Sequence, residues 1–231
     1  MLSIKKINFK YGSSQILYNV SVEAKKGEIT CMMGSNGVGK TSLLKFMSGI
    51  KNALSGSYYI NNKNVFNLPS HSLAKLGVGY VPQGRFIFPL LTVKENLEVG
   101  YACLVKSDWF IPEEIFTLFP VLKNMLHRRG GDLSGGQQQQ LAIARALITK
   151  PNILLMDEPT EGIQPSIIKQ IGEVILYLKK EKNMMIFLVE QYFDFAFDIS
   201  DYIYLMQRGK IIDEGKKNDL DRKVFMKKLS I

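Results

Sequence analysis

The stretch Gly34-Ser-Asn-Gly-Val-Gly-Lys-Thr41 decides the fold of this chain, because it fits the pattern G-x-x-x-x-G-K-[ST]. The apolar, β-prone run Glu28–Met33 precedes it, and the helix-like run Ser42–Met47 follows it. Glycines let a backbone curl until several N–H groups point at one anion, and the following helix adds its positive N-terminal end. A glycine turn that matched by chance would lack this strand and helix, so the stretch predicts a loop that wraps the phosphates of a nucleoside triphosphate.

The side chains of this loop have separate expected tasks. Lys40 is long and cationic, and we expect it to reach the β- and γ-phosphates. The Thr41 hydroxyl is expected to bind Mg²⁺. The residues predicted to surround the nucleotide here are Gly34, Ser35, Asn36, Gly37, Val38, Gly39, Lys40, Thr41 and Ser42.

Length and composition place the chain among globular cytosolic proteins. The 231 residues suit one large domain with room for a smaller lobe, and a hydrophobic content of 46% is enough for a full core. No run approaches the roughly 18 apolar residues of a membrane span, and the first residues lack the apolar part of a signal peptide. Cys31 and Cys103 have no metal-site spacing, so we expect a soluble protein in a reducing compartment, with Cys31 buried.

The formal net charge of +9 leaves three interpretations open. The lysines are spread along the chain, which favours an ordinary solvated surface. A mild attraction to an anionic membrane surface is the second interpretation. Nucleic-acid binding is the least favoured, because no aromatic residues alternate with the lysines as base stacking would require.

Two segments on either side of the phosphate loop also read as strands. Residues 2–9 and 16–24 read as an antiparallel pair around a turn that contains Tyr11. Tyr11 is placed either to stack on a purine or to be an ordinary exposed turn residue. The run Gly79-Tyr-Val-Pro-Gln83 is a strand that leaves Gln83 at its carboxyl end, where ligands of α/β sheets gather.

A helical segment follows, from about residue 85 to residue 131. Thr92–Val99, with Thr92 as a plausible N-cap, and Pro112–Phe119 have helical periodicity. This pattern predicts a helical insertion between two halves of an α/β core. Its aromatic side chains fit a docking surface or a core equally well, and they are Trp109, Phe110, Phe116 and Phe119.

The segment Leu133-Ser-Gly-Gly-Gln137 opens a helix that we expect to run from Gln138 to about Thr149. Ser134 is a candidate N-cap. Gly135 and Gly136 would leave free N–H groups at the positive end of this helix. The segment is therefore a second candidate anion site.

A buried-type strand, Ile153–Glu158, ends in two carboxylates. After a phosphate-binding loop in an α/β pattern, this arrangement favours Asp157 as a ligand of Mg²⁺ and Glu158 as the base for an attacking water. The remaining elements that we expect are a helix over residues 165–180, a strand over 184–189 that leads to Glu190-Gln191, and a closing hairpin over 202–214.

Together, in this order and spacing, the phosphate loop, Gln83, Leu-Ser-Gly-Gly-Gln and the strand ending in Asp-Glu resemble the ATP-binding cassette of ABC proteins. The resemblance covers essentially the whole chain. It implies an α/β fold of the P-loop NTPase type, with a RecA-like core, a small antiparallel β subdomain and an inserted helical subdomain. The expected division is residues 1–84 and 132–231 for the core with its β lobe, and 85–131 for the helical subdomain.

The resemblance also implies how the site works. In that family two cassettes pair head to tail, and each ATP lies between the phosphate loop of one subunit and the Leu-Ser-Gly-Gly-Gln segment of the other. Tyr11 would stack on adenine, and Gln83 would sense Mg²⁺ and the γ-phosphate and report to the membrane subunits. The residues that would face the partner's nucleotide are Ser134, Gly135, Gly136 and Gln137. The implied cofactors are ATP and Mg²⁺.

The chain departs from the general family pattern in two places. Gln191 stands where the family has His, and it would act beside Lys40 and Glu158 in catalysis; a Gln can donate to a γ-phosphate oxygen but carries no charge. His71 and His127 lie too far away in the sequence to replace that His. Residues 161–164 read Glu-Gly-Ile-Gln where the family has Ser-Ala-Leu-Asp. These departures predict a second cassette that is a related chain rather than an identical one.

Both departures resemble the ATPases of branched-chain amino acid importers and their urea-importing relatives. The strings at residues 128–140, 161–167 and 189–196 resemble the urea branch in particular. We therefore expect the ATPase subunit of a urea importer, at the cytoplasmic face of the inner membrane. Its expected partners are transmembrane permeases, a second cassette and, indirectly, a periplasmic solute-binding protein, and no nucleic acid.

Three alternatives to this interpretation stay open. The first is the ATPase of a branched-chain amino acid importer. The second is a soluble ABC ATPase that acts on nucleic acid or ribosomes, although such relatives carry coiled-coil insertions or tandem cassettes that this chain lacks. The third is a weakly catalytic, mainly nucleotide-binding partner in a heterodimer, against which Glu158 and the Leu-Ser-Gly-Gly-Gln segment argue.

Overall fold

The central element of the fold is a mixed sheet built around the strand that precedes the phosphate loop. The computed structural model describes residues 1–229, which form two sheets. All neighbouring strands of the larger sheet pair in parallel, except for the antiparallel β10–β9 edge. In spatial order its strands are β10 (Lys210–Lys216), β9 (Tyr202–Gln207), β3 (Ile29–Met33), β8 (Met185–Glu190), β7 (Ile153–Asp157) and β6 (Val78–Val81).

The inner strands are apolar on both faces because both faces are covered, as expected for a parallel sheet. Every residue of β3, β7 and β8 is buried. Alternate residues of β3 pack into different cores, Cys31 on one side and Met32 on the other. The carboxyl ends of β3, β7 and β8 meet at one edge of the sheet, and this edge positions the candidate site.

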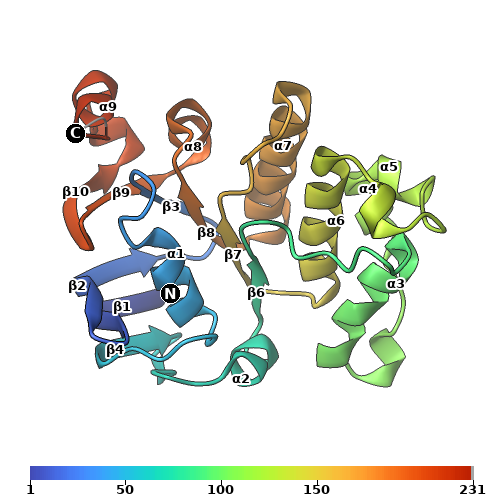
Figure 1. The fold of residues 1–231 in the computed structure, drawn as a ribbon, viewed down its shortest axis with the longest axis horizontal. Coiled ribbons are helices and arrows are strands. Elements are labelled where there is room, and N and C mark those ends of the chain that lie inside the picture. Colours follow the sequence, from blue (N-terminus) through green and yellow to red (C-terminus); the bar gives the residue numbers. More distant parts are fainter. Residues whose placement is uncertain (230–231) are drawn as a thin grey trace.

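A smaller antiparallel sheet lies across the phosphate-loop helix from the larger one (Figure 1). Its order is β2-β1-β4-β5, and its apolar face packs with that helix in the second core. Its strands are β1 (Leu2–Tyr11), β2 (Ser14–Ala24), β4 (Ser55–Ile60) and β5 (Lys63–Asn64), and the helix between the sheets is α1 (Lys40–Met47).

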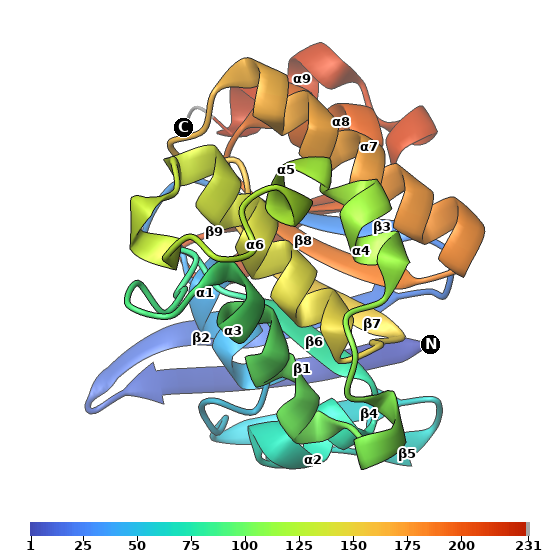
Figure 2. The same ribbon diagram turned by 90° about the vertical axis from the view of Figure 1, so that its right-hand side faces the viewer.

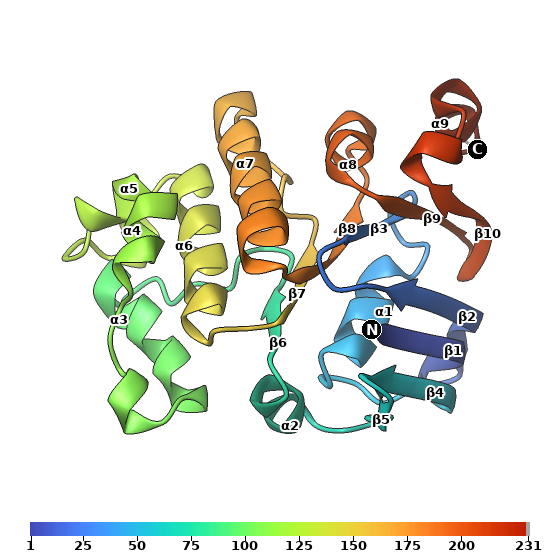
Figure 3. The same ribbon diagram turned by 180° about the vertical axis from the view of Figure 1, so that it is seen from behind.

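The other helices lie at the opposite face and at the ends of the larger sheet. Figure 3 shows α6, α7 and α8 side by side, with α2 below β6. Figure 2 shows α3, α4 and α5 in front of α6, at the end of the molecule away from α9. The helices are α2 (Ser70–Lys75), α3 (Val93–Glu98), α4 (Glu113–Leu118), α5 (Pro120–Lys123), α6 (Gly135–Ile148), α7 (Pro165–Lys182), α8 (Phe193–Ile199) and α9 (Arg222–Leu229), with 3-10 turns at 99–103, 106–108, 130–132 and 217–219.

Both predicted helix caps are confirmed. Thr92 caps α3, and its side chain and Glu95 exchange hydrogen bonds with each other's backbone, which is a capping box. Ser134 does the same for α6 with Gln137. The helix after Ser134 nevertheless begins at Gly135, three residues before the predicted start at Gln138, because this cap already satisfies the first turn.

Some predicted elements are longer in the structure, and several helices of the structure were not predicted from the sequence. The first strand pair is longer than predicted, and Tyr11 is the last residue of β1 rather than a turn residue. Helices α2, α8 and α9 were not predicted at all, because they are short and their apolar periodicity is weak. None of the helices within residues 1–229 is both long and apolar enough to cross a membrane.

The predicted aromatic side chains of the 85–131 segment differ in burial, and a docking role for the exposed ones stays a prediction. Phe119 is 1% exposed and belongs to the core. Trp109 and Phe110 are about half exposed. Trp109 stacks against Tyr101, and the Lys150 ammonium group lies over the Phe110 ring. Cys31 is fully buried as predicted.

Candidate functional site

The phosphate loop lies between the carboxyl end of β3 and the start of α1, as the sequence predicts. Gly39, the residue before the helix, has φ of 114°, a conformation that side chains other than glycine rarely adopt. A Cβ atom on Gly34 would lie 2.5 Å from the Met206 carbonyl oxygen, and one on Gly39 would lie 2.8 Å from the Leu17 side chain. These two glycines are therefore required by backbone shape and by close packing.

Lys40, the first residue of α1, turns its ammonium group back into the loop. Its Nζ donates to the carbonyl oxygens of Gly34 at 2.7 Å and Ser35 at 3.0 Å. It also lies 3.1 Å from Oε1 of Glu158, and both side chains are 3% exposed. The loop lysine and the candidate base are thus in direct contact.

An oxygen cluster lies beside this ion pair. Thr41 Oγ1 donates to Oδ1 of Asp157 at 3.1 Å, and the Tyr80 hydroxyl donates to Oδ2 at 3.4 Å. The pKa of Asp157 is raised to about 6, mainly by burial, with the Thr41 hydrogen bond opposing the rise and the neighbouring Glu158 carboxylate contributing to it. A hydroxyl and a carboxylate at this separation form an oxygen donor set of the kind that Mg²⁺ prefers.

Glu158 is held in an uncommon backbone conformation at the end of β7. Its φ is 47°, and its N–H donates to the Val189 carbonyl of β8 at 2.9 Å. Its Oε2 accepts from Gln83 Nε2 at 3.2 Å, and the same Nε2 donates to Glu161 at 3.1 Å. The structure therefore brings Gln83, two residues beyond β6, to the ends of β3 and β7.

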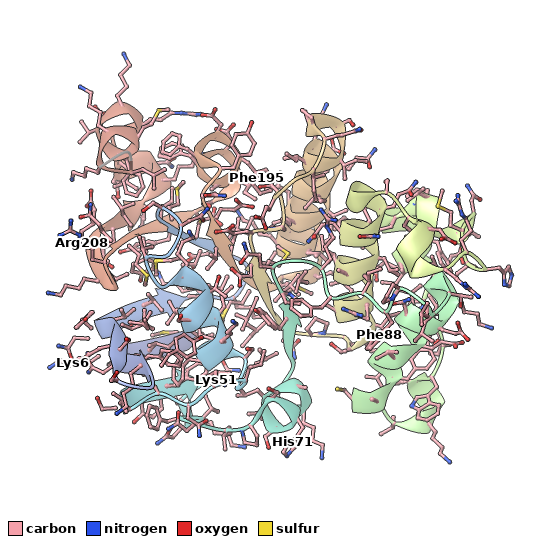
Figure 4. The ribbon with its side chains drawn as sticks, in the orientation of Figure 1. Lys6, Lys51, His71, Phe88, Phe195 and Arg208 are labelled. Carbon is pink, nitrogen blue, oxygen red and sulfur yellow. The ribbon has the colours of Figure 1, made fainter. Side chains whose placement is uncertain are left out.

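Gln191 follows β8 at the same edge of the sheet. Its backbone N–H donates to Glu190 Oε2 at 3.1 Å, and the residue is exposed. His71 does not compete for this place: Figure 4 shows it in α2, at the opposite end of the molecule from Phe195 of α8, the helix that follows Gln191.

The segment Ser134–Gln137 lies at the amino end of α6. A Cβ atom on Gly135 would lie 3.1 Å from the Arg85 guanidinium, and one on Gly136 would lie 3.0 Å from Ile167. Within residues 1–229 no hydrogen bond joins this segment to the phosphate loop.

Tyr11 is the last residue of β1. It is 40% exposed, and its ring packs edge-on against Phe9 at 4.9 Å. A partly exposed face is compatible with stacking on a base, and its role stays a prediction.

The sequence analysis did not assign three residues that complete the site. Glu161 accepts from Gln83, Tyr80 donates to Asp157, and Glu190 accepts hydrogen bonds from the loops after β7 and β8. Glu190 ends a strand as Asp157 does, so its position at the carboxyl edge was a usable signal. The contacts of Tyr80 and Glu161 depend on side-chain directions, which the sequence pattern does not give.

A cavity of about 840 Å³ lies next to these residues. Arg145 donates to the Phe86 carbonyl oxygen at 2.8 Å, and its guanidinium lies over the Phe88 ring. Arg145 therefore fixes the stretch that contains Phe86, which lines the cavity. Phe88 lies in the stretch before α3 (Figure 4). The cavity is lined by Thr41, Lys45, Ile50, Tyr80, Pro82, Gln83, Gly84, Phe86, Arg145, Asp157 and Glu161.

Comparison with known proteins identifies the family. A protein-family model described as "ABC transporter" matches residues 17–161. The chain is 43% identical to the high-affinity branched-chain amino acid transport ATP-binding protein BraG of Pseudomonas aeruginosa, across 92% of this chain and 91% of the relative. It is 38% identical to the probable branched-chain amino acid transport ATP-binding protein LivF of Archaeoglobus fulgidus, across 95% of this chain and 94% of the relative.

Solved structures agree with this assignment. A nucleotide-free ATP-binding cassette from an ABC transporter superposes with a TM-score of 0.84 at 29% identity, covering 94% of this chain and 91% of that one. A bacterial ABC transporter cassette solved as a dimer has a TM-score of 0.84 at 27% identity, covering 94% and 99%. The predicted fold class is thereby confirmed. The chain belongs to the ABC transporter family, as an ATP-binding domain that hydrolyses ATP.

Proposed function

We propose that this chain is the ATP-hydrolysing subunit of an importer for branched-chain amino acids. The observation that carries this proposal is the 43% identity to BraG over 92% of the chain. The similarity to LivF, over 95% of the chain, supports the same substrate class. The match extends over nearly the full length of both relatives, so it includes the surfaces that meet other subunits as well as the ATP site.

The urea importer expected from the sequence strings is not supported by these relatives. The strings at residues 128–140, 161–167 and 189–196 led to the expectation of the urea branch, but the two relatives named above are branched-chain amino acid transport proteins. The ATP site itself carries no information on the solute, because its side chains contact phosphate and metal rather than cargo.

In this proposal the Lys40–Glu158 ion pair is exchanged for contacts with the nucleotide. Lys40 leaves Glu158 and binds the β- and γ-phosphates, so Glu158 becomes free to orient and deprotonate the attacking water. Gln191 donates to a γ-phosphate oxygen from the adjacent loop. The preorganised N–H groups of residues 34–41 and the Lys40 ammonium stabilise the negative charge that develops in the transition state.

The oxygen donors present fit a magnesium ion. Thr41 and Asp157 would hold it, and Gln83, which lies against Glu158, would reach it with its amide oxygen. When bound, Mg²⁺ would neutralise charge on the β- and γ-phosphates. Asp157 would hold the ion as its ionised carboxylate.

We further propose that the working unit contains two cassettes and membrane-spanning permeases. A second cassette would complete each ATP site with its own Ser134–Gln137 segment, and the ABC transporter cassette solved as a dimer supports this arrangement. That partner would be a related chain or a second copy, and Tyr11 would stack on the adenine. The permeases would contact the cavity beside Gln83, where Phe86 is 70% exposed, at the cytoplasmic face of the membrane, with a periplasmic solute-binding protein supplying the solute.

Transport by a deletion strain tests this function. The strain is complemented with the wild-type gene or with the Glu158→Gln variant, and uptake of labelled leucine and of labelled urea is measured in parallel. We expect leucine uptake to be restored by the wild-type gene and not by the variant. Restoration of urea uptake without leucine uptake would replace the proposal by the urea importer, and restoration of neither would overturn both.

A further inference from the structure

Glu190 is a buried carboxylate that the proposed reaction does not use. It ends β8, directly before Gln191, and is 1% exposed. Burial of a carboxylate carries a large desolvation cost unless hydrogen bonds compensate for it. Cys31 of the neighbouring strand β3 lies close to it, with a thiol that burial keeps neutral by raising its pKa.

The Glu190 carboxylate accepts four hydrogen bonds, and its two oxygens serve two different loops. Oε1 accepts from the Thr160 N–H at 3.1 Å and from the Thr160 hydroxyl at 2.8 Å. Oε2 accepts from the N–H groups of Gln191 at 3.1 Å and Tyr192 at 3.3 Å. Thr160 lies two residues beyond Glu158, and Gln191 begins the other loop.

A second contact joins the same two loops. The Glu158 N–H donates to the carbonyl oxygen of Val189, the residue before Glu190. Glu158 has φ of 47°, and a residue persists in such a conformation when its surroundings fix it. Glu190 supplies part of that constraint, because it anchors Thr160 directly downstream.

A carboxylate is the side chain suited to this position. It accepts at both oxygens and donates nothing when ionised, whereas an amide of the same size accepts at one end only. Three of the four partners are backbone N–H groups, which can only donate. A packing role alone would not need a charged group here.

We propose that Glu190 is a positioning residue that couples the loop of Glu158 to the loop of Gln191. It holds the candidate base and the candidate γ-phosphate ligand in a fixed relation to one another, through backbone contacts and without touching the nucleotide. This inference rests on the proposed roles of Glu158 and Gln191.

The test compares the rate of ATP hydrolysis with the affinity for ATP in the full chain. Glu190→Gln keeps the size and shape of the side chain. It replaces one acceptor oxygen by an NH₂ group, which then faces the N–H and O–H groups that donate to Glu190. We expect its kcat to fall about tenfold or more, as the loss of hydrogen bonds to a charged group implies, while the Kd for a fluorescent ATP analogue stays within about twofold. The control is Glu214→Gln, which removes the same charge from an exposed position on the edge strand β10 and is expected to keep both values.

A double variant shows whether Glu190 acts through Gln191. If it does, Glu190→Gln/Gln191→Ala is slower than the slower single variant by no more than about twofold, because both changes remove one shared function. Fully additive losses in kcat would overturn the coupling. An unchanged kcat in Glu190→Gln, or equal losses in kcat and in ATP affinity, would overturn the inference as well.

A further variant applies if Glu190→Gln fails to fold by circular dichroism. Thr160→Val keeps the carboxylate and the Thr160 N–H and removes only the hydroxyl donor. A kcat lowered about threefold or more at unchanged Kd supports the coupling, and an unchanged kcat overturns it. The Glu158→Gln variant distinguishes a failure of the proposed function from a failure of this inference. Normal turnover in Glu158→Gln would overturn both the proposed site and the positioning role of Glu190. Loss of turnover in Glu158→Gln together with normal turnover in Glu190→Gln would overturn the positioning role alone.

Discussion

Lys40 and Glu158 form an ion pair beside the phosphate loop, with the Lys40 Nζ 3.1 Å from Glu158 Oε1 and both side chains 3% exposed. The group expected to bind phosphate and the group expected to activate water therefore neutralise each other. Breaking a buried pair by removing one partner leaves an uncompensated charge, which costs more than the pair itself contributes. This relationship makes the two single variants behave differently.

Lys40→Ala should lose ATP binding and also lose stability. The phosphates lose their cation, and Glu158 stays buried without its partner, which costs about 3–5 kcal/mol in comparable cases. Binding of a fluorescent ATP analogue and urea unfolding check both effects. The control is Lys40→Ala/Glu158→Gln, which should recover much of the lost stability but none of the binding; no recovery would show that the buried charge is not the cause.

Glu158→Gln should keep ATP binding and lose turnover. The amide retains the size and can still accept from Gln83, but it cannot take a proton from water, and removal of a general base lowers rates by about 10²–10⁴-fold. Hydrolysis measured at saturating ATP, next to the Kd, checks this result. Normal hydrolysis by this variant would exclude Glu158 as the base.

Gln191→Ala should slow hydrolysis in the assembled transporter by about tenfold, because one hydrogen bond to a charged phosphate oxygen is lost. The side chain is exposed, and its backbone contact with Glu190 remains in the variant. The fold should therefore be unaffected, with an unchanged melting temperature. An unchanged rate would show that Gln191 has no switch role and that its place after β8 is incidental.

Stability should fall as pH rises from about 4.5 to about 7, in part because of Glu190. Burial raises the pKa of this carboxyl from 4.5 to about 7, although the hydrogen bonds from Thr160, Tyr192 and Gln191 lower it. Between these two pKa values the folded chain binds more protons than the unfolded chain, so the free energy of unfolding falls as pH rises. The loss amounts to about 3 kcal/mol and is complete above pH 7. Asp157 also lowers the free energy of unfolding as pH rises, between pH 3.8 and about 6, because its pKa is raised over that range.

Glu190→Gln should flatten this slope. Urea unfolding of wild type and variant at pH 5 and at pH 7.5 gives the comparison, and each protein is compared with itself, so the altered hydrogen bonds of the variant cancel. Equal changes with pH in both proteins would assign the dependence to other groups.

Most of the fold could be predicted from the sequence, because its signals are local. The phosphate loop, the Ser134 and Thr92 caps and the buried strands each depend on neighbouring residues in the chain. Helix α8 could not be predicted, because its seven residues include five buried ones and give no amphipathic period. Its place depends on packing against α7, a contact made only after folding.

The sequence indicated which residues lie at the candidate site, but it did not indicate which of their side chains contact one another. Asp157, Glu158 and Gln83 were found as residues at strand ends, where an α/β sheet gathers polar groups. The Lys40–Glu158 pair and the contacts of Glu161 and Glu190 depend on rotamers, which no spacing rule determines. The choice between related solutes was also beyond the sequence strings, because both transporter branches share the same ATP chemistry.

The shared amide of Gln83 has a consequence for anion selectivity. Its Nε2 donates to both Glu158 and Glu161, and Glu158 in turn neutralises Lys40, so the protein's own carboxylates screen the positive end of the loop. An anion that binds Lys40 therefore competes with the Glu158 carboxylate for the same ammonium group. Coulomb attraction grows with charge, so the polyanionic triphosphate of a nucleotide competes better than a singly charged anion. The carboxylates beside the loop thus favour ligands of high negative charge.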